Sequence, residues 1–255
     1  MAETRILVVD DEPAVCRVIR RMLKRSDWNV EILNSPEQAL ERVAEGGFDL
    51  YILDKNMPRV SGLTLAAKIR TKDTVAGIVM FTGYDTIESA LTALHTGIDG
   101  YLVKPANRQL LSEVVEGALA AAARRRERPA RPGLTELKII VAGGVPSAKL
   151  AGELSEAGHD VAVVSSSVAL SELLGQGTPD LLVVDANLEG PDIFQVLTQA
   201  RTNLPRQALA VTWDGPPGVE TVKRLIDLGV EAVVDWQTDS ATLISLIDKL
   251  RQPIV

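Results

Sequence analysis

The sequence is poor in cysteine, histidine and aromatic residues, and these shortages argue against several classes of protein. A single cysteine among 255 residues excludes a disulfide framework, and with only two histidines it argues against a zinc site. No apolar run approaches the length that spans a membrane, and the first residues lack the pattern of a signal peptide. We therefore expect a cytoplasmic protein without a membrane partner.

Charge of neither sign dominates the whole chain, but it is unevenly distributed. The formal net charge of −7 consists of −3 in residues 1–123, +4 in residues 124–134 and −8 in residues 135–255. The short basic segment also contains two prolines and a glycine, which is typical of a linker between domains. We expect its arginines to lie at a solvated helix end. The acidic character of both larger segments argues against nucleic acid as a partner.

Several apolar runs in the first half end on a polar side chain. Residues 48–54 end on Asp54 and residues 5–10 end on Asp10, with Asp11 next; later runs end on Thr82 and Lys104. Runs of this length are typical of parallel strands buried on both faces, so the polar residues belong at the exposed carboxyl-terminal tips. Five such strands alternate with five amphipathic helices in residues 1–123. This alternation predicts an α/β fold, a flavodoxin-like doubly wound parallel sheet of order 2-1-3-4-5.

In a sheet of that order the tips of strands 1, 3, 4 and 5 converge on one crevice. Asp10, Asp11 and Asp54 would repel one another there unless a cation neutralised them, and carboxylate oxygens suit Mg²⁺. Asp54 could then attack phosphorus as a carboxylate nucleophile, while Lys104 stabilises the phosphoryl oxygens. The Thr82 hydroxyl would hydrogen-bond the new phosphoryl group. The sequence therefore predicts a phosphate acceptor at Asp54.

The motifs around these residues resemble the receiver domain of two-component response regulators over residues 1–123. They are Val9-Asp10-Asp11-Glu12, Leu53-Asp54-Lys55-Asn56-Met57-Pro58, Phe81-Thr82-Gly83 and Tyr101-Leu102-Val103-Lys104-Pro105. The resemblance implies that a histidine kinase or phosphotransfer protein phosphorylates Asp54 with Mg²⁺, to which the Asn56 backbone carbonyl contributes. It also implies a cis peptide between Lys104 and Pro105. It makes Tyr101, otherwise a half-buried strand aromatic, a switch that turns inward on phosphorylation.

The second half of the chain repeats the first, at an offset of about 131 residues. Residues 138–142 match the first strand, residues 179–185 match the run that ends on Asp54, and Thr212 matches Thr82. So regular an agreement indicates a duplication. We therefore expect residues 135–255 to form a second domain with the same (βα)5 fold, joined to the first by the basic linker of residues 124–134.

The chemistry is not repeated in this second copy. Gly143 and Gly144 replace the first two aspartates, and Asp235 or Trp236 falls where the lysine should be. Asp185 remains, but one carboxylate cannot assemble the metal site by itself. We interpret residues 135–255 as a pseudo-receiver, a docking or dimerisation module through which the chain contacts an output protein or a second copy.

Other functions are compatible with some of these residues. Both copies could accept phosphate in a relay if Asp185 were also reactive. An aspartate-nucleophile phosphohydrolase of the haloacid-dehalogenase kind is a further alternative, but that class requires a second aspartate where this chain has Asn56. A DNA-binding regulator would need a helix-turn-helix segment, and none remains once both copies are placed. We therefore expect a signalling protein rather than an enzyme.

Overall fold

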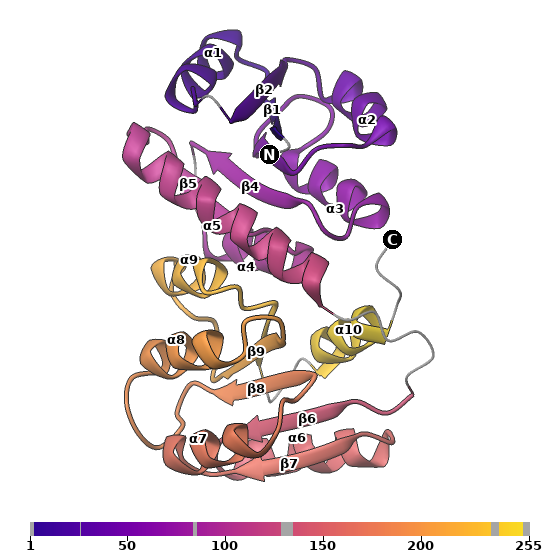
Figure 1. Ribbon diagram of the computed structural model, residues 1–255, viewed down its shortest axis with the longest axis vertical. Coiled ribbons are helices and arrows are strands. Elements are labelled where there is room, and N and C mark those ends of the chain that lie inside the picture. Colours follow the sequence, from indigo (N-terminus) through magenta and orange to yellow (C-terminus); the bar gives the residue numbers. More distant parts are fainter. Residues whose placement is uncertain (1–2, 26, 84–85, 129–134, 236–239, 252–255) are drawn as a thin grey trace. The chain divides into compact units, whose positions relative to one another are not determined.

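The computed structural model describes residues 3–25, 27–83, 86–128, 135–235 and 240–251. The chain forms two compact units, which divide between Arg126 and Glu127. In both units strands alternate with helices (Figure 1). Within the described ranges, no helix is both long enough and apolar enough to cross a membrane.

The first unit is a parallel sheet of five strands with five helices. Its elements are β1 (Thr4–Val9), α1 (Pro13–Met22), β2 (Trp28–Leu33), α2 (Pro36–Glu45), β3 (Leu50–Asp54), α3 (Gly62–Lys72), β4 (Gly77–Thr82), α4 (Ile87–Thr96), β5 (Gly100–Val103) and α5 (Arg108–Glu127). The strands are all parallel and have the order β2-β1-β3-β4-β5, which confirms the predicted topology. The order reverses between β1 and β3, so a crevice opens beyond the ends of those two strands.

Local sequence signals explain where the helices of this unit begin and end. The side chains of Ser35, Ser61 and Thr86 each accept a hydrogen bond from a backbone amide in the first turn of the helix that follows. Pro13 occupies the first turn of α1, where its missing N–H has no helical partner to lose. Gly97 ends α4 with a φ of 84°, a left-handed conformation that favours glycine. These ends fix the lengths of the loops around the crevice.

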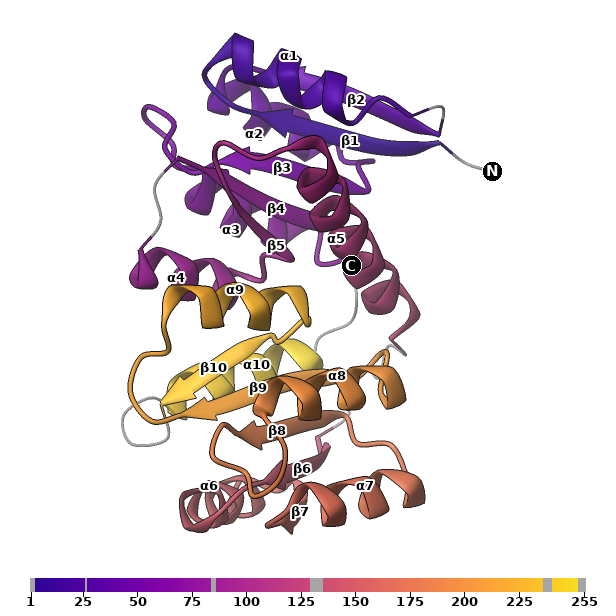
Figure 2. The same ribbon diagram turned by 90° about the vertical axis from the view of Figure 1, so that its left-hand side faces the viewer.

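Helices cover both faces of the first sheet (Figure 2). Helices α1 and α5 pack on one face, while α3 lies between α2 and α4 on the other. Every residue of β3 is buried, as expected of a central strand covered on both sides. The core between the sheet and helices α1 and α5 is formed by Ile6, Val8, Cys16, Ile19, Leu23, Trp28, Leu50, Ile52, Val79, Phe81, Leu102, Leu111, Val115 and Ala118.

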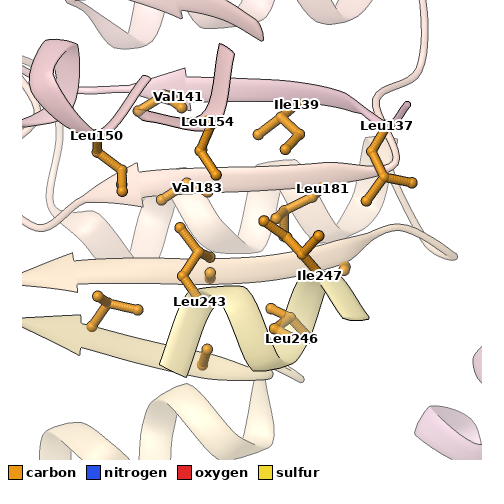
Figure 3. Packing of buried hydrophobic residues seen from close by; sticks show 14 of the residues in the cluster. Leu137, Ile139, Val141, Leu150, Leu154, Leu181, Val183, Leu243, Leu246 and Ile247 are labelled. Carbon is orange, nitrogen blue, oxygen red and sulfur yellow. The ribbon is translucent and has the colours of Figure 1, made fainter. Parts of the chain in front are cut away.

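The second unit has the same architecture. Its elements are β6 (Lys138–Ala142), α6 (Val145–Glu156), β7 (Asp160–Val164), α7 (Ser167–Gln176), β8 (Leu181–Asp185), α8 (Ile193–Asn203), β9 (Ala208–Trp213), α9 (Val219–Asp227), β10 (Ala232–Asp235) and α10 (Ser240–Arg251). Its parallel sheet has the order β7-β6-β8-β9-β10. Figure 3 shows Leu243, Leu246 and Ile247 of α10 on the same face of this sheet as Leu150 and Leu154 of α6, in one cluster with Leu181 and Val183 of β8. The predicted repeat of the fold is therefore confirmed.

The strand register of the second unit corrects one predicted equivalence. Asp54 pairs with Phe81 across β3 and β4, whereas Asp185 pairs with Thr212 across β8 and β9. Thr212 therefore occupies the place of Phe81, and the prediction that it corresponds to Thr82 was wrong by one residue. The shift matters because successive side chains of a strand point to opposite faces of the sheet.

The same register identifies the counterparts of the other chemical residues. Trp213 follows Thr212 and so occupies the place of Thr82, which replaces a small hydroxyl with an indole ring. Because Ala232 pairs with Ala210 as Gly100 pairs with Val79, Trp236 is the counterpart of Lys104. Trp236 lies outside the described residues.

Helix α5 is longer than predicted and includes the beginning of the segment that was predicted to be a basic linker. It continues to Glu127, so residues 124–127 are helical, while residues 129–134 lie outside the described part of the chain. Arg125 is not at a solvated helix end. Its guanidinium lies 2.5 and 2.8 Å from the two oxygens of Asp99, and it also donates to the carbonyls of Val75 and Ala76. A buried carboxylate requires a cationic partner, and only the tertiary fold brings these two together.

Candidate functional site

The strands of the first unit place two carboxylates side by side at the carboxyl edge of the sheet. Asp54 is the last residue of β3, and Asp10 directly follows β1, the neighbouring strand. Both side chains are almost fully buried, with 1% of Asp10 and 5% of Asp54 exposed. Carboxylates buried this deeply need hydrogen-bond donors and a positive charge nearby.

Lys104 supplies that positive charge. Its Nζ lies 2.7 Å from Oδ2 of Asp10 and 2.8 Å from Oδ1 of Asp54, so that one ammonium bridges the two carboxylates. Burial by itself would lower the pKa of Lys104, but its hydrogen bonds to both carboxylates raise the pKa above its ordinary value. Lys104 therefore stays protonated at neutral pH.

Backbone amides hold the remaining carboxylate oxygens in place. Oδ1 of Asp10 accepts a hydrogen bond of 2.9 Å from the Glu12 amide, and Oδ2 of Asp54 accepts one of 2.9 Å from the Asn56 amide. Burial raises the pKa of Asp10 even though Lys104 and the Glu12 amide favour its charged form. Each carboxylate thus receives one hydrogen bond from its own loop and one from the shared lysine, which fixes both orientations.

The predicted cluster of three carboxylates is not gathered in this structure. Asp11 is exposed, unlike its neighbour Asp10. Among the described residues, no three acidic, histidine or cysteine side chains are close enough together to hold a metal ion. The donor set still suits a hard divalent cation, because Asp10, Asp11, Asp54 and the Asn56 carbonyl offer only oxygen. In this structure Lys104 neutralises two of those groups, the carboxylates of Asp10 and Asp54.

Thr82 and Tyr101 are both in the core near the crevice. Thr82, the last residue of β4, is fully buried, and its carbonyl accepts a hydrogen bond of 2.7 Å from the Lys104 amide. Tyr101 in β5 is 4% exposed, so the half-buried position predicted from its place in the strand was wrong. The ring already points inward because β5 is covered on both faces. The cis peptide between Lys104 and Pro105 is confirmed.

Two residues beside Asp54 were missed by reasoning from sequence. Lys55 is buried to 8% exposure, and its Nζ lies 3.0 Å from the Ser89 hydroxyl on α4, so it links the loop after Asp54 to that helix. No sequence signal distinguishes this lysine from an ordinary surface cation. Gly62 begins α3 directly against β3, where a Cβ atom would overlap the carbonyl oxygen of Asp54. A glycine at the start of a helix could have suggested this close approach.

The corresponding place in the second unit has a different chemistry. Asp185 is 6% exposed and accepts hydrogen bonds from the Asn187 amide at 2.8 Å and from the Ser147 hydroxyl at 3.2 Å. A Cβ atom on Gly143 would overlap Ser147 Oγ, so the serine lies where an aspartate side chain would start. The buried Thr212 hydroxyl has no hydrogen-bond partner in the described residues. The neutral hydroxyl of Ser147 is thus the side-chain partner of Asp185, whereas the Lys104 ammonium is the partner of Asp54.

A buried aspartate at the tip of β3, a second aspartate after β1 and a bridging lysine after β5 define a receiver domain when they lie on a sheet of this order. The model of the response regulator receiver domain matches residues 6–116. The chain belongs to the response regulator family. It is 30% identical over 171 residues to the response regulator MprA of Mycobacterium sp. (strain KMS), an alignment that covers 67% of this chain and 71% of MprA.

Two further proteins are similar to about half of the chain. The transcriptional regulatory protein ZraR of Escherichia coli (strain K12) is 36% identical over 115 residues, which cover 45% of this chain. The chain spans only about a quarter of ZraR, 26% of its length. A response regulator receiver domain protein (CheY-like) from Methanospirillum hungatei JF-1 is 28% identical, with a TM-score of 0.46 and coverage of 48% of this chain and 98% of that structure.

Proposed function

We propose that the chain is a two-component response regulator in which Asp54 accepts a phosphoryl group from a histidine kinase or a phosphotransfer protein. The observation that carries the proposal is the Lys104 ammonium, which bridges Asp10 and Asp54 at 2.7 and 2.8 Å. That arrangement leaves an anionic nucleophile next to a fixed cation, which is the pairing that phosphoryl transfer requires.

Each residue of the crevice has a role in this proposal. The amide of Asn56 orients the Asp54 carboxylate, which attacks phosphorus. Lys104 stays near the acceptor and balances the charge of the equatorial oxygens. Thr82 offers its hydroxyl to the phosphoryl group. Mg²⁺, held by the carboxylates of Asp10, Asp11 and Asp54 and by the Asn56 carbonyl, would supply the additional positive charge that three phosphoryl oxygens need.

The consequence of phosphorylation is a change on the face formed by α4, β5 and α5. Thr82 and Tyr101 lie on the adjacent strands β4 and β5, so a group bound at Thr82 bears directly on the packing of Tyr101. Lys55 provides a second route, because its hydrogen bond to Ser89 ties the acceptor loop to α4. We propose that this face signals to an output protein and that the chain is not an enzyme.

The second unit acts as a pseudo-receiver in this proposal. Its sheet has the receiver topology, but Asp185 has Ser147 for a partner instead of a lysine. Without a cation, the negative charge that gathers during phosphoryl transfer would be uncompensated there. Docking of an output protein, or dimerisation with a second copy of the chain, is the role we assign to this unit. The phosphohydrolase alternative requires a second carboxylate at position 56, where this chain has an asparagine.

Beryllofluoride, which mimics a phosphoryl group on an aspartate, tests this function. Addition with Mg²⁺ should saturate the full chain at one site and change the near-ultraviolet circular dichroism of its aromatic residues, with oligomeric state followed by light scattering. Asp54→Asn should abolish the response, and Asp185→Asn should leave it unchanged. A response that survives Asp54→Asn would overturn the proposal.

A further inference from the structure

A basic groove lies at the amino-terminal end of the first sheet, away from the acidic crevice. Its volume is about 550 Å³, and it is bounded by α1, by the chain that leads from α1 to β2, and by the beginnings of β1 and β2. Five cations and one carboxylate, Glu3, line it, and four of the cations, Arg17, Arg20, Arg21 and Lys24, come from α1 and the turn that follows it. The concentration of positive charge stands out because residues 1–123 carry a net charge of −3.

The four cations follow one face of the helix and the turn that ends it. Their spacing of three, four and seven residues brings side chains to the same side of α1. All four are exposed, and within the described ranges none of them forms an ion pair. Arg25, in contrast, is paired with Asp27 and Glu116. The acidic side chain in the lining, Glu3, accepts a hydrogen bond from Asn29, so the four cations are available to an anionic ligand.

Arg25, Trp28 and Asn29 also line the groove, and they offer a planar cation and polar groups. The Arg25 guanidinium lies 4.5 Å from the centre of the Trp28 ring and is held there by Glu116 at 2.5 Å. A guanidinium fixed in this way can stack on a planar ring. The Asn29 side-chain amide, which also lines the groove, donates a 3.3 Å hydrogen bond to Glu3. This amide and this carboxylate could hydrogen-bond the polar edge of a bound aromatic ring.

The groove is separate from the phosphate acceptor. Thr4 pairs with Trp28 at the start of β1 and β2, whereas Asp10 follows the other end of β1. The six residues of β1 separate the two places by about 20 Å. A ligand in the groove would therefore contact neither Asp54 nor Lys104, and its binding does not depend on the proposed phosphorylation.

We propose that this groove binds a small ligand in which an aromatic base is joined to at least two phosphate groups, such as a nucleoside diphosphate. Arginine and lysine at helical spacing can each bond a phosphate oxygen, and the Arg25 and Trp28 wall accepts the base. The volume lies within the range of small-molecule sites. Duplex nucleic acid fits less well, because the unit as a whole is acidic and the cations lie in a hollow.

Calorimetric titration of the full chain with ADP tests this proposal at low ionic strength. Arg20→Ala combined with Arg21→Ala should weaken ADP binding about tenfold or more, because two charge-assisted bonds are lost. The matched control removes two exposed cations of α3, Lys68→Ala with Lys72→Ala, and should leave the affinity unchanged. Adenosine and inorganic pyrophosphate should each bind at least about tenfold more weakly than ADP.

Three results would overturn the proposal. The first is an equal loss of affinity in the two double variants, provided that both melt at the temperature of the wild-type chain. The second is pyrophosphate binding as tight as that of ADP, which would leave no role for the base. The third is a duplex DNA that binds more tightly than ADP and is released by the α1 substitutions, which would make the groove a surface for polyanions.

Discussion

Lys104 Nζ lies 2.8 Å from Asp54 Oδ1, although fifty residues separate the two in the sequence. The same ammonium contacts Asp10, so the three side chains form one hydrogen-bonded unit at the edge of the sheet. Lys104 keeps its charge because the two carboxylates raise its pKa. Asp54 is therefore the better candidate for the acceptor, because the side-chain partner of Asp185 among the described residues is the neutral Ser147 hydroxyl.

Removal of that ammonium should impair phosphorylation strongly. Lys104→Met keeps the length of the side chain and leaves Asp10 and Asp54 buried without a counter-charge. We expect the initial rate of labelling by acetyl phosphate with Mg²⁺ to fall by about 100-fold, the usual effect of losing one stabilising group of a transition state. Lys68→Met, on the exposed surface of α3, is the control. A Lys104→Met rate close to that of the control would contradict the role of Lys104.

Arg125 should contribute to stability far more than its neighbour Arg126. Burial alone would raise the pKa of Asp99, but Arg125 and Arg70 hold the pKa below its ordinary value. Arg125→Ala should lower the free energy of unfolding by about 2–3 kcal/mol, because a buried carboxylate loses one of its two cations. Arg126→Ala removes a half-exposed pair with Asp49 and should cost less than about 1 kcal/mol. Urea denaturation of both variants measures the two losses of unfolding free energy, and equal losses would contradict the larger contribution expected of Arg125.

An attempt to restore the first metal carboxylate in the second unit should fail for a steric reason. Any Cβ atom at position 143 overlaps Ser147 Oγ most closely and also the Cβ atom of Asp185, so Gly143→Asp should destabilise this unit by about 2 kcal/mol or more. Adding Ser147→Ala should recover part of the loss, since the overlapping oxygen is gone. Differential scanning calorimetry of the single and double variants measures both effects. Equal melting temperatures for the two variants would show that Ser147 does not fill this position.

His159 should make the second unit sensitive to acid. Its Nδ1 accepts a 3.3 Å hydrogen bond from the Leu137 amide, and Arg251 lies 3.3 Å from Nε2. Burial first, and then the charge of Arg251, lower the pKa of His159 from the ordinary 6.5, while Glu136 acts in the opposite direction. The unfolded chain therefore binds a proton at a higher pH than the folded one, and stability is lost as the pH falls below about 6.5. Melting temperatures between pH 7.5 and 5 should fall less steeply for His159→Gln than for wild type; parallel slopes would exclude His159 as the cause.

Much of the fold could be predicted because each structural signal was local. The buried strands appear as short apolar runs: β6 begins and ends at the residues that its run indicates, and β4 ends at the predicted Thr82. Asp54, Thr82 and Lys104 stand at the ends of those runs, so the predicted strand order was sufficient to place them at one edge of the sheet. The cis bond before Pro105 followed from the resemblance to the receiver domain.

The remaining features depend on partners that are distant in sequence. Arg125 and Lys55 looked like surface cations, since nothing near them shows that Asp99 or Ser89 lies within hydrogen-bond distance. Thr212 was assigned to the wrong position because a continuous apolar run has no alternation to fix its register. The partner of Asp185 was equally hidden: Ser147 is on a different element, and only the fold brings the two together.

Mass spectrometry of the intact protein can determine whether only one of the two similar aspartates accepts phosphate, as we propose. Wild type, Asp54→Asn and Asp185→Asn would each be incubated with acetyl phosphate and Mg²⁺ under the same conditions. We expect one phosphoryl group on wild type and on Asp185→Asn, and none on Asp54→Asn. A phosphoryl group retained by Asp54→Asn and lost in Asp185→Asn would contradict this expectation, because it would place the reactive carboxylate at Asp185, whose side-chain partner is Ser147 and not a lysine.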